Sequence, residues 1–455
     1  MRQIVVLIAL LLVTGGCANY RQYSRPDGIE TGNLFGDDVA SDSDTVSVAS
    51  IPWREFFTDT RLQALIDTAL AYNSNLRIAS LRVAQAEATL SAARLAYLPA
   101  VSLNPQSGIS SYAGEKAAKT YSLGLSADWE IDIAGRITNE KRAAVASLWQ
   151  QKYYRQAVAT QLVATVANSY YNLLALDRQL EISRLSLESW DEIIRTLRVR
   201  KDVGEAHEAS VAQAVASRLD VENTILSLSR QIKAQENSLC TLLGRTPGKI
   251  ERGELKSQLF PDDIALGVPL GLLENRPDVR QAEYALQEAF YSVNVARSAF
   301  YPSLTLSGTV GWTNNSGAAI VNPGNWLLNA IGSLTQPLFN RGRNISNLKI
   351  SKARQEEALL TFRQKLLDAG SEVNDALVQW QNADLRLEVS ARQIEALEGA
   401  VRATRLLMTY SSGSNYLEVL TAQQSLLTAQ LTETQEIFDK IQGIIKLYHA
   451  LGGGA

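Results

Sequence analysis

The chain has 455 residues, a length that would allow about three domains. Lys and Arg number 44 against 47 Asp and Glu, and a net charge of −3 argues against a nucleic-acid binder, which needs cations to neutralise phosphates. With only two cysteines and two histidines, the chain has no disulfide framework and little material for metal binding or histidine acid–base chemistry. Composition therefore disfavours most enzymes, and we expect neither a metal site nor a cofactor.

The N-terminal residues are typical of a signal peptide. Arg2 precedes an unbroken run of ten apolar residues, Ile4 to Val13, which is too short to span a bilayer. Thr14, Gly15 and Gly16 come directly before Cys17, and this resembles a bacterial lipobox, in which the cysteine is lipidated and becomes the mature N-terminus. The pattern departs from the usual one, because Thr14 stands where a lipobox usually has Leu.

Two interpretations of Cys17 follow. In the first, Cys17 carries a covalent lipid and residues 18–50, which are polar and lack periodicity, form an extended tether. In the second, the signal peptide is cut elsewhere and Cys17 lies in the discarded part. Cys240 sits in a Leu-rich segment and is predicted to be a small buried hydrophobic residue.

The sequence repeats itself once. The segment that ends at Pro99 matches the segment that ends at Pro302, 203 residues later, and the pair Gly135-Arg136 matches Gly342-Arg343 with a shift of 207. The four extra residues fall in the loop region between these landmarks. A repeat of this length exceeds solenoid periods of about 20–50 residues, so it indicates a duplicated domain.

Each repeat contains two stretches that alternate apolar and polar side chains, which is the pattern of strands with one apolar and one polar face. Their length is close to the 9–11 residues of a membrane-spanning strand. The stretches are 101–112, 121–132, 303–312 and 325–336, joined by the polar loops 111–120 and 314–325.

Asp128, Glu130 and Asp132 lie on the polar side of one predicted strand. Such a cluster could be mistaken for a carboxylate pair of a glycosidase or for a hard-metal site. The alternation with Trp129 and Ile131 instead favours a polar face that lines a water-filled lumen. No nucleotide-binding or nucleophile motif supports an enzyme.

The remaining sequence predicts long helices with a period of seven. Eight apolar residues follow one another at this spacing from Leu359 to Met408, and a second row three residues further on is mostly small, which predicts a coiled-coil seam. The first repeat has the same seam from Val166 to Ile194. The long helices begin near the Gly-Arg pairs and would reach about 100 Å at 1.5 Å per residue. The last helix carries two apolar rows, Leu417, Gln424, Leu431, Phe438 and Ile445 with Leu420, Leu427, Thr434, Ile441 and Tyr448.

Four strands cannot close a barrel. Strands that enter a membrane must leave no unpaired edge in lipid, and about eight is the smallest common barrel. Two chains would supply eight strands and three would supply twelve. The strand count thus predicts an oligomer and leaves dimer and trimer open.

Several signatures together resemble the TolC-like outer membrane efflux proteins, in the lipoprotein branch that serves resistance–nodulation–division pumps. The resemblance covers about residues 50–450. Its motifs are WREFFTDTRLQALIDTALAYNSNL from Trp53, DWEIDIAGR from Asp128, RPDVR from Arg276 with Ala282-Glu283, FYPSL from Phe300, PLF from Pro337 before Gly342-Arg343, and YSSGSNYLEVLTAQ from Tyr410.

The resemblance implies a homotrimer with a twelve-stranded outer-membrane β-barrel, four strands per chain, that continues into a long periplasmic α-helical coiled-coil barrel. It also implies that two helical hairpin turns contact a periplasmic adaptor, which links the duct to an inner-membrane pump, and that they form the gate. The turn residues are Lys201, Gly204, Tyr410 and Gly413, and the gate candidates are Asp202, Glu205, Tyr416 and Glu418. Relatives often carry Asp and Arg where this chain has Thr421 and Gln424, so their charged gate does not transfer directly.

The expected organisation is a signal peptide, a lipidated tether and two repeats. The expected function is a passive exit duct for small molecules in the outer membrane, anchored by lipid, with no nucleic acid as partner. Two alternatives stay open: a type I secretion duct for proteins or peptides, and a periplasmic coiled-coil adaptor. The boundaries are 1–16, 17–50, 51–250 and 251–455, with β-hairpins at about 100–132 and 302–338 and helical hairpins at 135–243 and 342–451.

Overall fold

The computed structural model describes residues 21–26, 51–111, 114, 117–258, 276–313, 325–410 and 416–454. Cys17, the signal peptide and most of the tether lie outside these residues, as does Gly413. The chain forms two compact units, and each is described by itself. The first unit comprises residues 1–29, 80–153 and 280–365, and the second comprises 30–79, 154–279 and 366–455.

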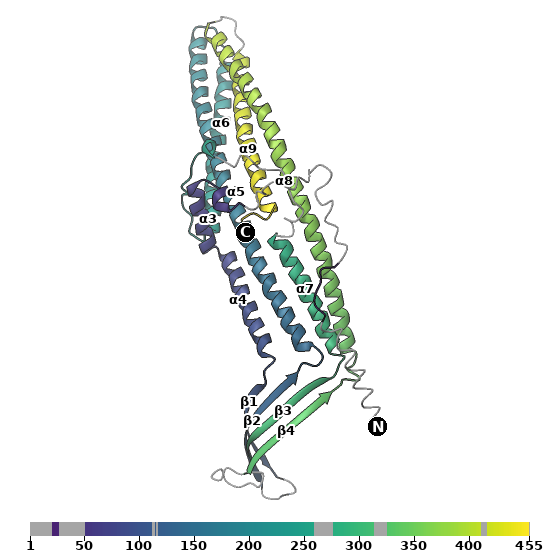
Figure 1. Ribbon diagram of the computed structural model, residues 1–455. Helices are drawn as coiled ribbons and strands as arrows, with labels where there is room; N and C mark the ends of the chain where they lie inside the picture. The colour runs from purple at the N-terminus through teal and green to yellow at the C-terminus, as the bar shows by residue number, and fades with distance from the viewer. Residues whose placement is uncertain are drawn as a thin grey trace. The chain divides into compact units, whose positions relative to one another are not determined.

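The first unit contains a four-stranded antiparallel sheet with the strands in chain order (Figure 1). Two hairpins, one from each repeat, lie side by side, because β2 of the first pairs with β3 of the second. The strands are β1 (Ala100–Ser110), β2 (Ala118–Ile131), β3 (Ser303–Thr313) and β4 (Asn325–Thr335). These four strands confirm the prediction that each alternating segment of the sequence forms a strand.

The register gathers the alternating residues onto two faces. Leu125 stands opposite both Leu103 and Val310, whereas Ser126 stands opposite Ser102 and Thr309. One face is therefore apolar and the other polar across the three strands. The apolar face is uncovered: Val101, Leu103, Ile109, Leu328 and Leu334 are each more than 60% exposed. An exposed apolar surface of this extent is typical of a membrane or protein interface.

The predicted loop 111–120 is too long at its second end. β2 begins at Ala118, which pairs with Ser110, and Thr120 pairs with Gly108. Residues 118–120 resemble a loop in composition, but the backbone ladder of the hairpin extends through these three residues. Cross-strand pairing thus overrides local composition at this position.

The first unit also holds the segments of four helices that adjoin the strands, and the remainder of each of these helices belongs to the second unit. α4 (Ser74–Leu95) precedes β1, and α7 (Pro277–Ser298) precedes β3. α5 (Arg136–Asp202) follows β2, and α8 (Arg343–Tyr410) follows β4, so both long helices begin at the Gly-Arg pairs as expected. Within this unit α4 and α5 pack through a small cluster: Val83, Leu90, Ala144 and Leu148.

The second unit is helical and has the larger core. It contains α2 (Trp53–Phe56), α3 (Thr60–Tyr72), α6 (Glu208–Leu242), α9 (Tyr416–Ala450) and the short 3-10 helix η3 (Leu255–Ser257). Phe56 stacks on Tyr448 with a centroid distance of 4.0 Å, and both rings belong to this core. Cys240 is fully buried there, as predicted. The principal side chains of this core are Phe57, Leu62, Ile66, Tyr170, Tyr171, Leu173, Leu239, Ile441 and Ile445.

The seven-residue period corresponds to buried positions. Leu366, Val373, Val401 and Met408 are at most 8% exposed, and the other residues of that row on α8 are half-buried. The second row, which begins at Phe362, is buried or half-buried throughout. On α9 the second predicted row, from Leu420 to Tyr448, is buried throughout, whereas the first row is wrong at its start, because Leu417 and Gln424 are exposed. Near its N-terminus, α9 buries Val419, Ala422 and Gln423 in addition to Leu420.

Among the described residues, no helix combines the length and the apolar character that a transmembrane helix requires.

Candidate functional site

The polar face of the sheet carries hydrogen bonds between strands. The Ser307 hydroxyl donates to Asp128 Oδ1 at 2.6 Å and joins β3 to β2, and the Asn104 amide donates to the Ser126 hydroxyl oxygen at 2.8 Å and joins β1 to β2. Asp128 thus has the Ser307 hydroxyl as a partner on the polar face of the sheet, and its position in a lumen stays a prediction. Within the described residues no group of acidic, histidine and cysteine side chains could hold a metal ion.

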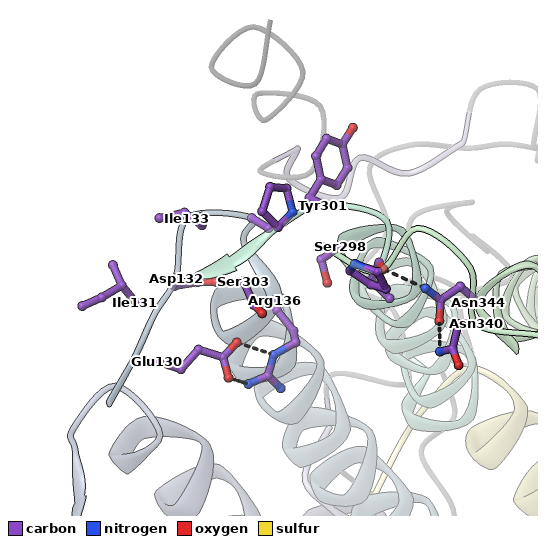
Figure 2. Close-up of a pocket in the computed structure, with 14 residues that line it drawn as sticks. Glu130, Ile131, Asp132, Ile133, Arg136, Ser298, Tyr301, Ser303, Asn340 and Asn344 are labelled. Carbon is purple, nitrogen blue, oxygen red and sulfur yellow. Dashed lines mark hydrogen bonds and ion pairs between the residues drawn. The ribbon is translucent and has the colours of Figure 1, made fainter. Parts of the chain in front are cut away.

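Glu130 and Asp132 contact the start of α5, a role that the alternating strand pattern does not predict. Arg136 donates to both carboxylate oxygens of Glu130, at 2.8 and 2.5 Å (Figure 2). It also donates to Glu140 at 2.6 Å. The hydrogen bond to Glu130, together with the charges of both carboxylates, outweighs burial and raises the pKa of the Arg136 guanidinium. The two hydrogen bonds between Arg136 and Glu130 therefore link the first residue of α5 to the end of β2.

Asp132 caps the same helix. Its carboxylate accepts hydrogen bonds from the Ile137 and Thr138 backbone nitrogens, at 3.1 and 2.8 Å, and from the Thr138 hydroxyl at 2.6 Å. Backbone N–H groups at a helix N-terminus have no partner within the helix, and a carboxylate there is favoured. Two of the three carboxylates predicted to line a lumen therefore also hold the first turn of α5 in place.

A cavity of about 290 Å³ lies beside this pair in the first unit, where the segment between β2 and α5 meets the turn between α7 and β3 (Figure 2). The Asn344 amide donates to the Ala299 carbonyl oxygen at 2.9 Å, and the Asn340 amide donates to Asn344 Oδ1 at 3.2 Å. The cavity is thus bordered by both repeats. Its lining includes Glu130, Asp132, Arg136, Ser298, Tyr301 and Asn340.

Residues 21–26 form a strap across α5 and α7. Arg25 makes two hydrogen bonds with Glu283, at 2.8 and 2.9 Å, and Tyr23 packs edge-on against Phe290 with centroids 5.8 Å apart. Arg142 of α5 donates to the Arg21 carbonyl oxygen at 3.4 Å. Burial raises the pKa of Tyr23 to about 12. The strap has no periodicity, so no local pattern in the sequence distinguishes it from the rest of the predicted tether.

Arg276, from the RPDVR signature, is a buried cation in the second unit. Its guanidinium donates to Asp278 and to Glu372, at 2.9 and 2.7 Å, and to the Ala450 carbonyl oxygen at 2.9 Å. It therefore joins the start of α7, α8 and the end of α9. Burial, followed by the charge of Arg276, lowers the pKa of the neighbouring His449 imidazole.

The turn between α5 and α6 is held by its backbone. The Glu205 N–H donates to the Arg200 carbonyl oxygen at 2.8 Å and the Gly204 N–H to that of Lys201 at 3.0 Å, the paired bonds of a Schellman cap. Gly204 has a φ of +81°, as the turn prediction requires. Lys201 also forms an ion pair of 2.7 Å with Glu208.

The gate candidates at this turn are on the surface. Asp202 is the last residue of α5 and is exposed, and Glu205 lies 3.3 Å from Arg200 as an ion pair. His207 is exposed as well.

The second predicted turn falls between α8 and α9, at residues 411–415, which lie outside the described residues together with Gly413. Tyr410 is the last residue of α8. Tyr416 opens α9 and packs against a cluster that includes Met408, Val419 and Leu420, so within one chain its ring belongs to the helical core. Glu418 is exposed in the first turn of α9. The structure thus places Glu418, and not Tyr416, on the open surface.

The open-edged sheet and paired long helices define a class of outer-membrane channel. The chain matches the family described as "Outer membrane efflux protein" over residues 65–245 and again over 269–453, so it belongs to that family. The two matches agree with the duplication. The protein is accordingly a channel of bacterial efflux systems in the outer membrane, with a periplasmic helical extension, and it is not an enzyme.

Relatives match over nearly their whole length. The chain is 29% identical to the probable outer membrane lipoprotein SilC of Salmonella typhimurium, with 98% of each chain covered, and 31% identical to the pyoverdine export outer membrane protein OpmQ of Pseudomonas aeruginosa, with 98% and 96% covered. It is 29% identical to the cation efflux system protein CusC of Escherichia coli, again with 98% of each chain covered. A solved CusC structure superposes with a TM-score of 0.85 at 27% identity and covers 95% of this chain and 99% of that one.

Proposed function

We propose that the protein is the passive exit duct of a tripartite efflux pump, through which small molecules pass from an inner-membrane resistance–nodulation–division pump and a periplasmic adaptor to the outside. The supporting observation is the sheet of the first unit, which has an exposed apolar face, a polar face with Asp128, and two open edges. Such a sheet suits lipid on one side and water on the other once its edges are closed.

Closure of the edges requires further copies of the chain, and we assign a homotrimer with twelve strands. In water a single copy would leave the backbone groups of both edges to solvent, but in hydrocarbon each unpaired group costs several kcal/mol. Native mass spectrometry in mild detergent is expected to give three copies of the chain. A folded monomer that retains its strand content would contradict this assembly.

The lipid anchor belongs to the same proposal. Cys17 precedes the strap by four residues, and the strap is fixed to α5 and α7 by Arg25 and Tyr23. A lipid on Cys17 would therefore be attached close to a part of the chain that is held against the first unit. Mass spectrometry of the mature N-terminus is expected to find an acylated Cys17, and an unmodified N-terminus that begins after residue 17 would contradict it.

The two helical turns are assigned to the adaptor. Lys201 and Gly204 lie at the turn between α5 and α6, where both capping hydrogen bonds are made, Tyr410 ends α8, and Gly413 lies outside the described residues. A capped turn with exposed charges offers a defined surface for a partner. The gate is assigned to charged residues near the same turns: Asp202, Glu205 and Glu418.

The test of function uses cells that lack the gene. Such cells are expected to accumulate a fluorescent cationic dye and to become sensitive to toxic small molecules, and expression of the full chain should reverse both effects. The same cells without the cognate inner-membrane pump should show no rescue, because the duct has no energy source of its own. Loss of a secreted protein or peptide, with unchanged dye efflux, would favour the type I secretion alternative.

A further inference from the structure

Several side chains that line the cavity of the first unit already use their hydrogen-bond donors on protein oxygens. Ser298 and Ser303 each donate to a backbone carbonyl oxygen, at 2.6 and 3.5 Å. The amides of Asn340 and Asn344 donate to an amide oxygen and to a backbone oxygen (Figure 2). The Arg136 guanidinium donates to two carboxylates. A ligand that needed donors from these side chains would have to displace hydrogen bonds of the protein.

Hydrogen-bond acceptors are more available in the same cavity. Each carboxylate oxygen of Glu130 accepts one hydrogen bond from Arg136, and a carboxylate oxygen can accept about two. Asp132 brings a second carboxylate into the lining, so two carboxylates stand against one guanidinium. The lining is therefore negatively charged and rich in acceptors. It favours a ligand that donates hydrogen bonds and carries positive charge, because hydrogen bonds between ionised groups are the stronger ones.

An organic cation suits this cavity better than a metal ion. Among the residues that the structure describes, no group of acidic, histidine and cysteine side chains could hold a metal. The cavity volume of about 290 Å³ is close to that of the smallest pockets that hold small molecules, about 300 Å³. Apolar side chains form another part of the lining: Ile131, Ile133, Pro302 and Pro337. A small ring or a short chain beside a cationic group thus matches both parts.

The duplication shows that the fold does not require polar residues at these positions. With the shifts of 207 and 203 residues, the polar residues Glu130, Asp132, Ser298 and Tyr301 correspond to Pro337, Phe339, Leu95 and Leu98. α8 nevertheless begins at the same point of its repeat as α5 does, at the arginine of the Gly-Arg pair. A helix therefore starts there without either carboxylate. The polar lining belongs to one repeat junction only, and a purely structural role does not account for it.

The cavity adjoins the polar face of the sheet. Glu130 and Ser303 occupy positions on their strands that share this face with Asp128, because the register places Asp128 opposite Ser307 and Glu130 opposite Thr305. Two residues of the lining, Ser303 and Asn340, are exposed, so the cavity is accessible to solvent. In the proposed duct this face borders the path of the transported molecules.

We propose that this cavity binds the primary ammonium group of small amphipathic molecules, with the carboxylates of Glu130 and Asp132 as acceptors. The ring or chain of the ligand lies against the apolar part of the lining. The inference rests on the proposed function for the route by which the ligand arrives, and it names amines with one apolar group as a class of transported molecule.

The first test compares three small molecules of similar shape and different charge. Binding of 2-phenylethylammonium to the full chain in mild detergent is measured by ligand-observed NMR titration, and 2-phenylethanol and 3-phenylpropionate serve as the neutral and the anionic probe. The ammonium compound is expected to bind at least fivefold more tightly than the alcohol, and the carboxylate is expected not to bind. Equal affinity for the ammonium compound and the alcohol, or tighter binding of the carboxylate, would overturn the proposal.

The second test removes each charge and keeps an oxygen that accepts hydrogen bonds. Glu130→Gln leaves an acceptor for Arg136 and Asp132→Asn leaves one for the first turn of α5, so both variants are expected to fold. Each should weaken binding of 2-phenylethylammonium at least fivefold. Asp128→Asn is the matched control, because it removes the same charge from the same face outside the cavity lining, and it should change the affinity less than twofold.

These results separate the binding site from the duct. Equal weakening by all three variants would show a general attraction of cations to the polar face and would overturn the site, as would unchanged affinity in both cavity variants. The unfolding midpoint of each variant is measured in parallel, and the two cavity variants test the site independently if one of them is unstable. Dye efflux in cells is scored separately. Intact efflux without binding overturns the site alone, whereas binding by a chain that does not restore efflux overturns the proposed function and leaves the site.

Discussion

The indole nitrogen of Trp129 donates a hydrogen bond of 2.9 Å to the carbonyl oxygen of Tyr97. In the second repeat the amide nitrogen of Gln336 donates a bond of 2.8 Å to the carbonyl oxygen of Phe300. Gln336 is 207 residues after Trp129 and Phe300 is 203 after Tyr97, so the two bonds are equivalent. Each repeat thus ties the end of its second strand to the turn before its first strand, although the side chains differ.

The bond predicts a modest and specific loss of stability. Trp129→Phe keeps an aromatic ring on the apolar face and removes the donor, which should cost about 1 kcal/mol of unfolding free energy. Gln336→Leu should have an effect of the same size and sign in the second repeat. Scanning calorimetry in detergent measures both, and an unchanged unfolding midpoint for either variant would show that its bond adds nothing to stability.

Gly204 and Gly399 form a matched pair of substitution sites that tests the turn between α5 and α6. Gly204 has a positive φ, and a Cβ there would meet no atom within 4 Å, so Gly204→Ala changes only the backbone preference and should cost about 1–2 kcal/mol. Gly399 lies inside α8 with equal space around it, and Gly399→Ala should instead stabilise by about 0.5–1 kcal/mol. Thermal unfolding with both variants in parallel measures the difference. Equal shifts of the same sign would contradict the turn argument.

Much of the fold follows from the sequence because it is periodic. The alternation at residues 303–312 and the seven-residue rows from Leu359 and Phe362 each repeat along a whole element. Such a repeat predicts both the type of element and the face that it buries. Because the sequence is duplicated, each element is predicted twice, from two different segments of the chain. The boundaries of the elements are harder to predict from the sequence. β2 extends three residues into the predicted loop, because its pairing with β1, and not its composition, determines where it starts.

The site was less predictable, for a physical reason. Glu130 and Asp132 share the strand period with Asp128, but their partners Arg136 and Thr138 lie beyond the strand, where the period no longer applies. The strap depends on contacts between Arg25 and Glu283, 258 positions apart, and no local pattern records them. Short-range periodicity reveals which face a residue occupies, but not which distant group it meets.

His449 predicts a dependence of stability on pH. Its pKa in the folded protein lies below 6.5, first because the imidazole is buried and second because Arg276 is close, whereas Glu372 and Asp278 oppose the shift weakly. The unfolded chain therefore binds the proton more readily than the folded chain. Stability from this residue is complete above about pH 6.5 and falls as the pH decreases through the folded pKa.

The measurement is the unfolding of the second unit at pH values between 8 and 5, monitored by limited proteolysis. The variant His449→Gln should lose less stability over this range than the natural chain, because glutamine does not titrate. At pH 8 the two proteins should differ little. An identical loss in both would assign the acid sensitivity to other groups.

The last prediction concerns the gate. Glu418 is exposed at the start of α9, and in the proposed trimer three copies of its carboxylate would approach the axis. A ring of three negative charges attracts cations and repels anions, as acidic rings do in other pores. Glu418→Gln should therefore lower cation selectivity in planar-bilayer recordings and leave trimer formation unchanged.

A matched control separates the pore effect from a helix effect. Glu208 occupies the first turn of α6 as Glu418 does that of α9, and an acidic residue there stabilises a helix by about 0.3–1 kcal/mol. Glu208→Gln should cause a comparable loss of stability and little change in selectivity. If Glu418→Gln leaves both selectivity and conductance as they were, Glu418 faces away from the axis. The constriction then belongs to Asp202 or Glu205 at the other turn, and Asp202→Asn should produce the change in selectivity that Glu418→Gln did not.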